Sequence, residues 1–272
     1  DFSERKAFIE KTITDQEKMT PALQEKINAA SSLAELEDIY LPYKPKRKTK
    51  AQTAREQGLE PLALALQEQS AGNVQELAKP FINDSVVSEE AALQGARDIL
   101  AEWINEDALI RADIRKLFEE QALFKSKLIA DKETEAAKYK DYFDFDEPIA
   151  KIPSHRILAI MRGFMEGVLR MSIAPEEEIA LLQIEKKKIV ASNDAADQVK
   201  KAIKDAYRRL LQPSLEAEFR TALKQKADEE AIQVFAENLR QLLLSSPLGG
   251  KRLLAIDPGY RTGCKIVCLD ES

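Results

Sequence analysis

The segment between residues 252 and 270 differs in kind from the rest of the chain and limits what the chain can fold into. Its first apolar run, Leu253 to Ile256, has the length of a strand and ends at a turn signal, Asp257-Pro258-Gly259. A second, alternating run from Cys264 to Leu269 follows. Two strands cannot bury a hydrophobic core alone. We therefore expect a β-hairpin that opens a truncated C-terminal domain, and we expect it to be poorly ordered or to pair with another element or another molecule.

The rest of the chain has the composition of a helical protein. Of its 272 residues only 9 are glycine, whereas 32% are charged and 44% are hydrophobic, which favours packed helices over glycine-punctuated β structure. We predict a mainly α fold: a multi-subdomain helical bundle with helix-turn-helix-like units, a possible small β-hairpin and the truncated C-terminal hairpin. The predicted divisions are a helical N-terminal domain (1–127), a connector and long-helix region (128–250) and the start of the C-terminal domain (251–272).

Clear start and stop signals divide the N-terminal third into short helices. Thr20 before Pro21 marks one helix start, and Ser32 with Glu35 forms a capping box at another. Gly58 suits a left-handed cap at the end of a helix. Short helices joined at sharp turns favour the helix-turn-helix-like arrangement. The pattern predicts helices at residues 33–40, 49–57, 61–69 and 73–79.

Longer helices are predicted after Ser88. Apolar stripes cover residues 92–104 and 110–118, with an interruption near Asn105. Two long amphipathic helices are predicted near the other end, at 195–211 and 214–244, before a linker at 245–250.

The region between these helices is harder to assign. Residues 126–150 are mixed and aromatic, and we expect a connector with at most one short helix. Ser154 should cap a helix that Gly163 or Gly167 stops. Residues 168–173 and 179–190 fit either two strands or a strand and a helix, and we favour a hairpin.

Charge and cysteine usage exclude several classes of protein. The net charge is −6, so any binding of nucleic acid must be local. No apolar run approaches the roughly 18–20 residues of a membrane span, and the N-terminus lacks a signal peptide's apolar core. Cys264 and Cys268 lie about 13 Å apart on a strand, too far for a disulfide. With His155 as the single histidine they also fall short of a zinc site, so we read them as reduced core cysteines of a cytoplasmic protein.

Three segments together resemble the signatures of a known family. They are Glu35 to Lys50, which includes Leu-Pro-Tyr-Lys-Pro-Lys; Ile152 to Gly163, with Glu166 to Arg170 behind it; and Asp257 to Lys265. In this order they resemble the bacterial Tex family of transcription accessory proteins.

The resemblance implies both a fold and a function. The chain would be the helical N-terminal part of a Tex protein, without its first helices, followed by the opening hairpin of a YqgF-type, RNase H-like domain. It implies a non-catalytic nucleic-acid-binding scaffold in the cytoplasm, linked to transcription. RNA or DNA would be bound mainly by domains absent from this chain, the transcription machinery is a further expected partner, and no cofactor is implied.

A basic run is the first candidate for a binding site. Pro42 and Pro45 keep it extended, so its cations can follow a phosphate backbone, and Tyr40 and Tyr43 could stack on bases if exposed. The candidate nucleic-acid contacts in it are Lys44, Lys46, Arg47, Lys48 and Lys50.

The alternative for this run is structural. The tyrosines would pack on the bundle, and the cations would pair with Glu35, Glu37 and Asp38. We favour this reading slightly, because one short basic run in an acidic chain is a weak electrostatic signal.

The second candidate is the start of the helix predicted at Ser154. His155 and Arg156 lie in its first turn, where free N–H groups favour an anion, and Arg162 and Arg170 could add charge. These residues either hold a phosphate or tie the helix to the fold. We favour the structural role, because capped helix starts are common and the histidine has no recognisable catalytic partners.

Asp257 is the only candidate for catalysis. It should end a buried strand, and it resembles the first acidic position of RNase H-like nucleases, where several carboxylates hold two metal ions. A single carboxylate does not make that site, and Asp257 could instead cap the turn. We therefore expect no catalysis and no bound metal. The alternatives are a metal-dependent nuclease or resolvase that begins at Asp257, and a protein–protein interaction scaffold.

Overall fold

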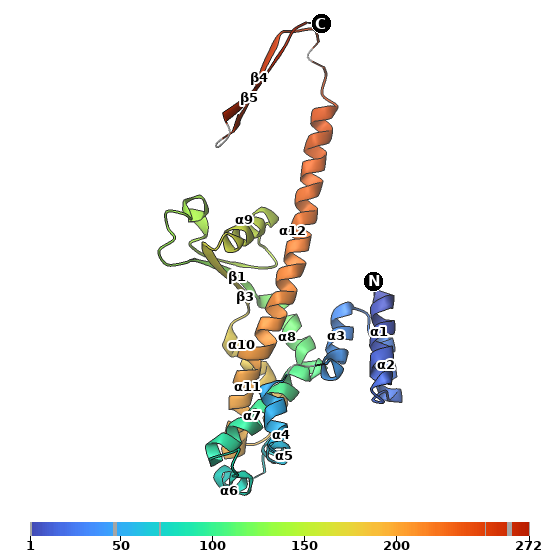
Figure 1. Cartoon of the computed structure of the whole chain (residues 1–272), viewed down its shortest axis with the longest axis vertical. Coiled ribbons are helices and arrows are strands. Elements are labelled where there is room, and N and C mark those ends of the chain that lie inside the picture. The colour runs from blue at the N-terminus through green and yellow to red at the C-terminus, as the bar shows by residue number, and fades with distance from the viewer. Residues whose placement is uncertain (1, 46–47, 71, 248, 260–262, 272) are drawn as a thin grey trace.

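The long helix α12, Gln212–Leu243, extends away from the helical body and leads to the C-terminal hairpin (Figure 1). The structure is a computed structural model, and it describes residues 2–45, 48–70, 72–247, 249–259 and 263–271. It is predominantly α-helical with small antiparallel sheets, which confirms the predicted fold class. The predicted divisions at 127 and 250 and the helix-turn-helix-like character stay predictions.

The first three helices form a small unit with its own core. They are α1 (Phe2–Asp15), α2 (Pro21–Ala29) and α3 (Leu33–Tyr40), and a 3-10 turn, Leu41–Tyr43, follows. Both predicted helix starts are confirmed, because the Thr20 hydroxyl accepts from the N–H of Leu23 and the Ser32 hydroxyl from that of Glu35. The buried side chains of this unit are Ile9, Ile13, Leu23, Ile27, Leu36 and Tyr40.

A second, larger core surrounds α7 (Glu89–Glu106). Helices α4 (Lys50–Glu56), α5 (Glu60–Glu68) and α11 (Asp194–Ala206) pack against it, with α6 (Val74–Ala78) at the end of the bundle. Gly58 ends α4 with a φ of 77°, as predicted. α8 (Ala108–Gln121) follows α7 after Asp107, whose carboxylate caps it. Within the described residues, no helix is both long enough and apolar enough to cross a membrane.

The prediction for residues 126–150 is right about one short helix, the 3-10 helix Ala137–Tyr142, but wrong about the rest, because this region contributes two strands to a sheet. β1 (Leu123–Leu128) pairs antiparallel with both β2 (Asp144–Pro148) and β3 (Leu169–Ala174), in the order β2-β1-β3. Its neighbours come from distant parts of the chain, so local pattern could not reveal them. Buried and more exposed side chains nevertheless alternate along β1, where Phe124 and Ser126 are buried on one face.

The hairpin expected from residues 168–173 and 179–190 is also wrong. The first segment is β3, but the second is helix α10, Glu177–Lys188. Its buried residues Ala180 and Ile184 are four apart, which is helical spacing. Acidic residues in its first turn and lysines in its last turn suit the helix dipole.

Helix α9, Ser154–Met165, packs across α12, but its start differs from the prediction. Pro153 occupies the cap position, and the Ser154 hydroxyl instead donates to the carboxylate of Glu230 on α12. Gly167, the other predicted stop, ends the helix with a φ of 70° just beyond Glu166. Gly163 does not stop the helix. It lies within it, where a Cβ would be 2.6 Å from the side chain of Leu169.

The two long helices predicted near the C-terminal end form one continuous run. α11 leads through a π-helical turn, Tyr207–Leu211, directly into α12. Pro213 has no N–H to donate, and the N–H of Gln212 reaches back to the carbonyl of Tyr207. The proline is therefore accommodated by a wider turn, and α12 continues for 32 residues, about 48 Å at the usual rise.

Buried charges join the small N-terminal unit to the larger core. Asp38, 4% exposed, accepts from Arg111 Nε at 2.6 Å and from Arg115 Nη1 at 2.7 Å, both on α8. Arg115 also donates to Glu218 on α12 at 2.6 Å, and Arg111 to the Ser214 hydroxyl at 3.1 Å. Burial alone would lower the pKa of Arg115, but hydrogen bonds to Asp38 and Glu218 raise it above the usual value. We call these four residues, Asp38, Arg111, Arg115 and Glu218, the charged joint.

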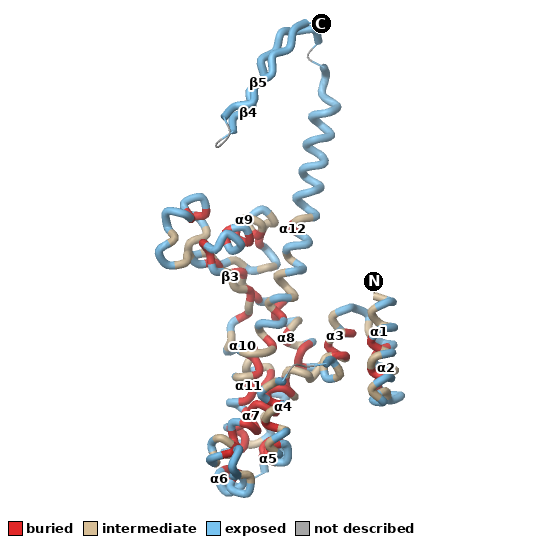
Figure 2. The backbone as a smooth tube through the Cα atoms, viewed as in Figure 1, coloured by how far each residue is buried: buried red, intermediate tan, exposed pale blue. Residues whose placement is uncertain are grey.

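The C-terminal hairpin is formed as predicted, with β4 (Leu253–Gly259) antiparallel to β5 (Gly263–Leu269). The strand continues through Asp257-Pro258-Gly259, so placing the turn there is wrong. Every described residue of both strands is exposed, including Cys264 and Cys268, which are free thiols but not core residues (Figure 2). The described part of the chain supplies no element that pairs with the hairpin, and pairing with another molecule stays a prediction.

We expect Gly95→Ala to destabilise the larger core, because the added Cβ would lie 2.3 Å from a methyl of fully buried Leu59 and 3.3 Å from Ala54 Cβ. Overpacking should cost about 1–3 kcal/mol, more than the gain of roughly 1 kcal/mol from helix propensity. Thermal unfolding measures the change. Gly72→Ala is the control, since nothing lies within 4 Å of its added Cβ. Equal melting temperatures for the two variants would contradict the expected clash.

We expect Asp38→Asn to loosen the N-terminal unit, because it leaves two buried guanidinium groups without their shared carboxylate. The free energy of local opening should fall by about 3 kcal/mol. This corresponds to roughly hundredfold faster amide hydrogen exchange in α3. The control is Glu135→Gln, which removes an exposed ion pair with Lys132. Unchanged exchange in α3 would show that apolar contacts hold the unit in place.

Candidate nucleic-acid interface

The basic run borders a cleft between the N-terminal unit and the larger core. The cleft has a volume of ≈790 Å³. Gln16 and Lys18, beyond the end of α1, line one side, and α4 and α7 line the other. Four cations line it, Lys18, Lys44, Lys48 and Arg55, together with the carboxylates Glu56, Glu102 and Glu106.

Three of these cations, Lys44, Lys48 and Arg55, have carboxylate neighbours. Lys44 Nζ lies 3.7 Å from Glu37 and Lys48 Nζ lies 3.2 Å from Glu56, and both lysines are more than half exposed. Arg55 is held more firmly, since it donates to Glu102 at 2.7 Å. The exposed lysine pairs are weak and can exchange partners, so a phosphate could displace either carboxylate.

Among the described residues, one pair of the structural reading of the run is present. Lys44 pairs with Glu37, as that reading predicted. Glu35, however, accepts from the backbone and hydroxyl of Ser31, and Asp38 belongs to the charged joint. Sequence alone did not reveal that the arginines of α8 would form ion pairs with Asp38.

The two tyrosines differ in what they can contact. Tyr40 is 3% exposed and packs edge-on against Phe8, with Arg5 over its ring, so it cannot stack on a base. Tyr43 is half-buried and lines the cleft, where its carbonyl accepts from Gln16 at 2.9 Å. Of the two tyrosines, only Tyr43 therefore lies at the cleft.

The remaining members of the run lie beside the cleft or cannot be placed. Lys46 and Arg47 fall outside the described residues. Lys50 is exposed in the first turn of α4. Burial raises the pKa of Asp98, and the positive charges of Arg209 and Lys50 partly offset that rise.

The candidates on α9 do not converge on one point. Arg156 donates to Glu147 on β2 at 2.8 Å and lies over the ring of Phe145, which fits the structural role. His155 is exposed in the first turn, whereas Arg162 is exposed in the last turn, about 10 Å further along the axis. Arg170 extends from β3 opposite Lys127 of β1.

Asp257 is part of the C-terminal hairpin. It lies within exposed β4 opposite Lys265, not at the end of a buried strand as expected. Among the described residues, no three His, Cys, Asp or Glu side chains cluster closely enough to hold a metal ion.

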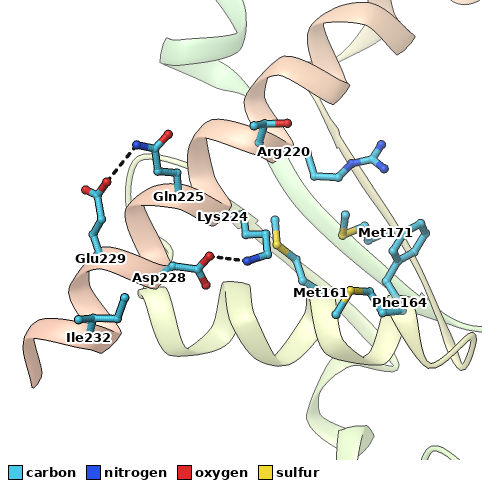
Figure 3. A pocket seen from close by; sticks show the side chains of 11 residues that line it. Met161, Phe164, Met171, Arg220, Lys224, Gln225, Asp228, Glu229 and Ile232 are labelled. Atoms are coloured by element: carbon cyan, nitrogen blue, oxygen red, sulfur yellow. Dashed lines mark hydrogen bonds and ion pairs between the residues drawn. The ribbon is translucent and has the colours of Figure 1, made fainter. Parts of the chain in front are cut away.

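An apolar groove that the sequence did not predict lies between α9 and α12 (Figure 3). Its volume is ≈470 Å³, and Met161, Phe164 and Met171 lie on one side of it. On α12, Arg220 lies over the ring of Phe164, and its Nε is buried without a hydrogen bond. The repeated Met and Phe of residues 161–171 were the signal available in the sequence.

Comparison with known proteins agrees with the resemblance seen in the sequence. The family model described as Tex central region-like matches residues 69–235. The chain is 42% identical over 277 residues to Protein tex of Bordetella pertussis, covering 96% of this chain and 35% of that protein. It is 40% identical to Transcriptional accessory protein Tex of Neisseria gonorrhoeae, covering 100% of this chain and 37% of the relative.

A human protein is also related. S1 RNA-binding domain-containing protein 1 of Homo sapiens is 32% identical over 275 residues, which cover 94% of this chain and 27% of that protein. The chain thus spans about a third of the length of its curated relatives. Since the family model covers more than half of the chain, and relatives that carry the Tex name match nearly all of it at about 40% identity, the chain is a member of the Tex family.

Proposed function

We propose that the chain is a non-catalytic scaffold that binds nucleic acid in the cytoplasm as part of a transcription accessory protein. The observation that carries the proposal is the cleft of ≈790 Å³ at the basic run, bordered by two separately packed helical units. The charged joint fixes these units relative to each other. A ligand in the cleft would therefore contact both units at once.

The chemistry of the cleft favours a phosphate backbone. Lys18, Lys44 and Lys48 border it, and the pairs made by Lys44 and Lys48 are exposed enough to be exchanged for phosphate oxygens. Tyr43 offers a partly exposed ring for a base. The carboxylates of the cleft make binding weak and dependent on salt, so single-stranded RNA or DNA with adaptable backbone geometry is the ligand we favour.

The names of the relatives support the link with transcription and RNA. One is called a transcriptional accessory protein and another carries an S1 RNA-binding domain in its name. We extend both to this chain, with the transcription machinery as a further partner. The long α11–α12 run would hold domains at fixed distances, since a continuous helix is stiff over this length.

The non-catalytic part of the proposal rests on Asp257. A two-metal nuclease needs several convergent carboxylates, and Asp257 faces a lysine across the hairpin.

We expect single-stranded RNA to bind at low salt and the triple variant Lys46→Ala, Arg47→Ala, Lys48→Ala to bind about tenfold more weakly. Each lost phosphate contact should reduce the slope of log K against log salt by about 0.7. Fluorescence anisotropy over a salt series, with RNA and DNA of the same sequence, measures both quantities.

The matched control removes the same charge elsewhere. Lys200, Lys201 and Lys204 are exposed on α11, and their triple alanine variant should bind almost as tightly as the unchanged chain. Equal losses in the two variants would mean that binding follows net charge alone. Absence of binding at low salt would overturn the proposed function of this chain.

We expect no cleavage of RNA, DNA or branched DNA when the chain is incubated with Mg²⁺ or Mn²⁺, and no effect of Asp257→Asn. Gel analysis of end-labelled substrates provides the measurement. Metal-dependent cleavage that the substitution abolishes would instead establish the nuclease.

A further inference from the structure

A second pocket adjoins the basic cleft at Lys44, whose side chain lines both. It lies at the charged joint, where α3, α8 and the start of α12 meet (Figure 1). Its volume of ≈470 Å³ is within the range of small-molecule sites. We call it the joint pocket. The side chains in it that a ligand can reach are those of Leu33, Ala34, Glu37, Lys44, Ser214 and Glu218.

The accessible carboxylates of the joint pocket retain capacity to accept hydrogen bonds. The side chains of Glu37 and Glu218 are 37% and 35% exposed, whereas Asp38 and the two arginines of the joint are largely buried against one another. Each carboxylate oxygen can accept two hydrogen bonds. Glu218 accepts one bond on each oxygen, from Nε and Nη2 of Arg115. Further acceptor positions therefore remain for N–H groups of a ligand.

Ser214 supplies a donor one helical turn before Glu218. Its Oγ accepts from Arg111 Nη2 at 3.1 Å, and among the described residues its own O–H has no acceptor. Side chains four positions apart share one face of a helix. The first turns of α12 thus present a hydroxyl donor and a carboxylate acceptor side by side. Leu33, which is 49% exposed, and Ala34 add an apolar wall from α3.

The charges around the joint pocket favour a neutral ligand over an ion. Of the described residues, three cations and three carboxylates line it. A phosphate would be repelled by the carboxylates, and an ammonium or guanidinium group would be repelled by the cations. A neutral, planar molecule with N–H donors and apolar faces avoids both costs. A nucleobase has these properties.

Guanine fits the polar groups of the joint pocket better than the other bases. Its Watson–Crick edge carries the acceptor O6 followed by the donors N1–H and N2–H₂. The O–H of Ser214 suits O6, and the carboxylates suit the two donors. Adenine and cytosine each place a ring-nitrogen lone pair beside their amino group, which would face a carboxylate. Uracil offers one N–H donor between two acceptors.

We propose that the joint pocket receives a guanine base of a single strand whose phosphate lies at Lys44. The inference rests on the proposed function, because it takes the strand in the cleft as its starting point. Lys44 lines both cavities, so a strand anchored there has a base next to the joint pocket. The charged joint holds α3 against α12, which keeps the walls of the pocket at a fixed separation.

Fluorescence anisotropy at low salt tests the base preference. Short uridine strands carry one central guanosine, inosine or adenosine, so that their backbones are identical. We expect the guanosine strand to bind about tenfold more tightly than the adenosine strand, as for a good pair of hydrogen bonds to a base edge. Inosine keeps N1–H but lacks the N2 amino group, so its strand should fall between the two.

A filled pocket provides the matched variant. Ala34→Leu places a larger side chain in the joint pocket and should reduce the guanosine preference to less than about twofold, measured as the ratio of two affinities of the same variant. Ala217→Leu makes the same change at an exposed site of α12 that does not line the pocket, and it should keep the full preference. Circular dichroism checks that both variants keep their helices.

The outcomes separate this inference from the proposed function. Equal binding of the guanosine, inosine and adenosine strands would overturn the inference and leave the binding of nucleic acid in the cleft intact. A guanosine preference that Ala34→Leu leaves unchanged would also overturn it, because the base would then bind elsewhere. Absence of binding by every strand would overturn the proposed function and the inference together.

Discussion

The charged joint determines how the two helical units of this protein are placed. Each unit has its own hydrophobic core, and the contact between them is centred on one carboxylate, Asp38, shared by Arg111 and Arg115. Hydrogen bonds have strict geometry, whereas apolar contacts tolerate sliding. The orientation of the N-terminal unit, and with it the shape of the basic cleft, therefore depends on a few polar atoms.

The continuous α11–α12 run also helps to fix the relative positions of the two units, because its residues bind the arginines of the charged joint. Glu218 and Ser214 near the start of α12 complete the bonding of Arg115 and Arg111, so the long helix is fixed to both units. The π-helical turn before Pro213 lets the run continue where a proline would ordinarily end it. One stiff element thus connects the helical body, the sheet with α9 and the C-terminal hairpin.

Local signals predicted much of the fold but little of its assembly. Thr20, Ser32 and Gly58 act within one turn of their own helix, so their roles could be read from neighbouring residues. β1 pairs with strands from elsewhere in the chain, and α10 was mistaken for a strand because its Ala-Leu-Leu run fits both periods. The basic run was recognisable by composition. The ion-pair partners of its cations were not recognisable. Asp38, one of the expected partners, instead accepts hydrogen bonds from arginines more than 70 positions away.

Hydrogen-exchange footprinting with bound single-stranded RNA tests the central claim most directly, because it reports which amides the ligand covers. Our account predicts slower exchange at the end of α1, in residues 43–56 and at the adjoining part of α7, on both sides of the cleft. Protection confined to α9 and the sheet, or no protection at an RNA concentration that saturates binding, would contradict it.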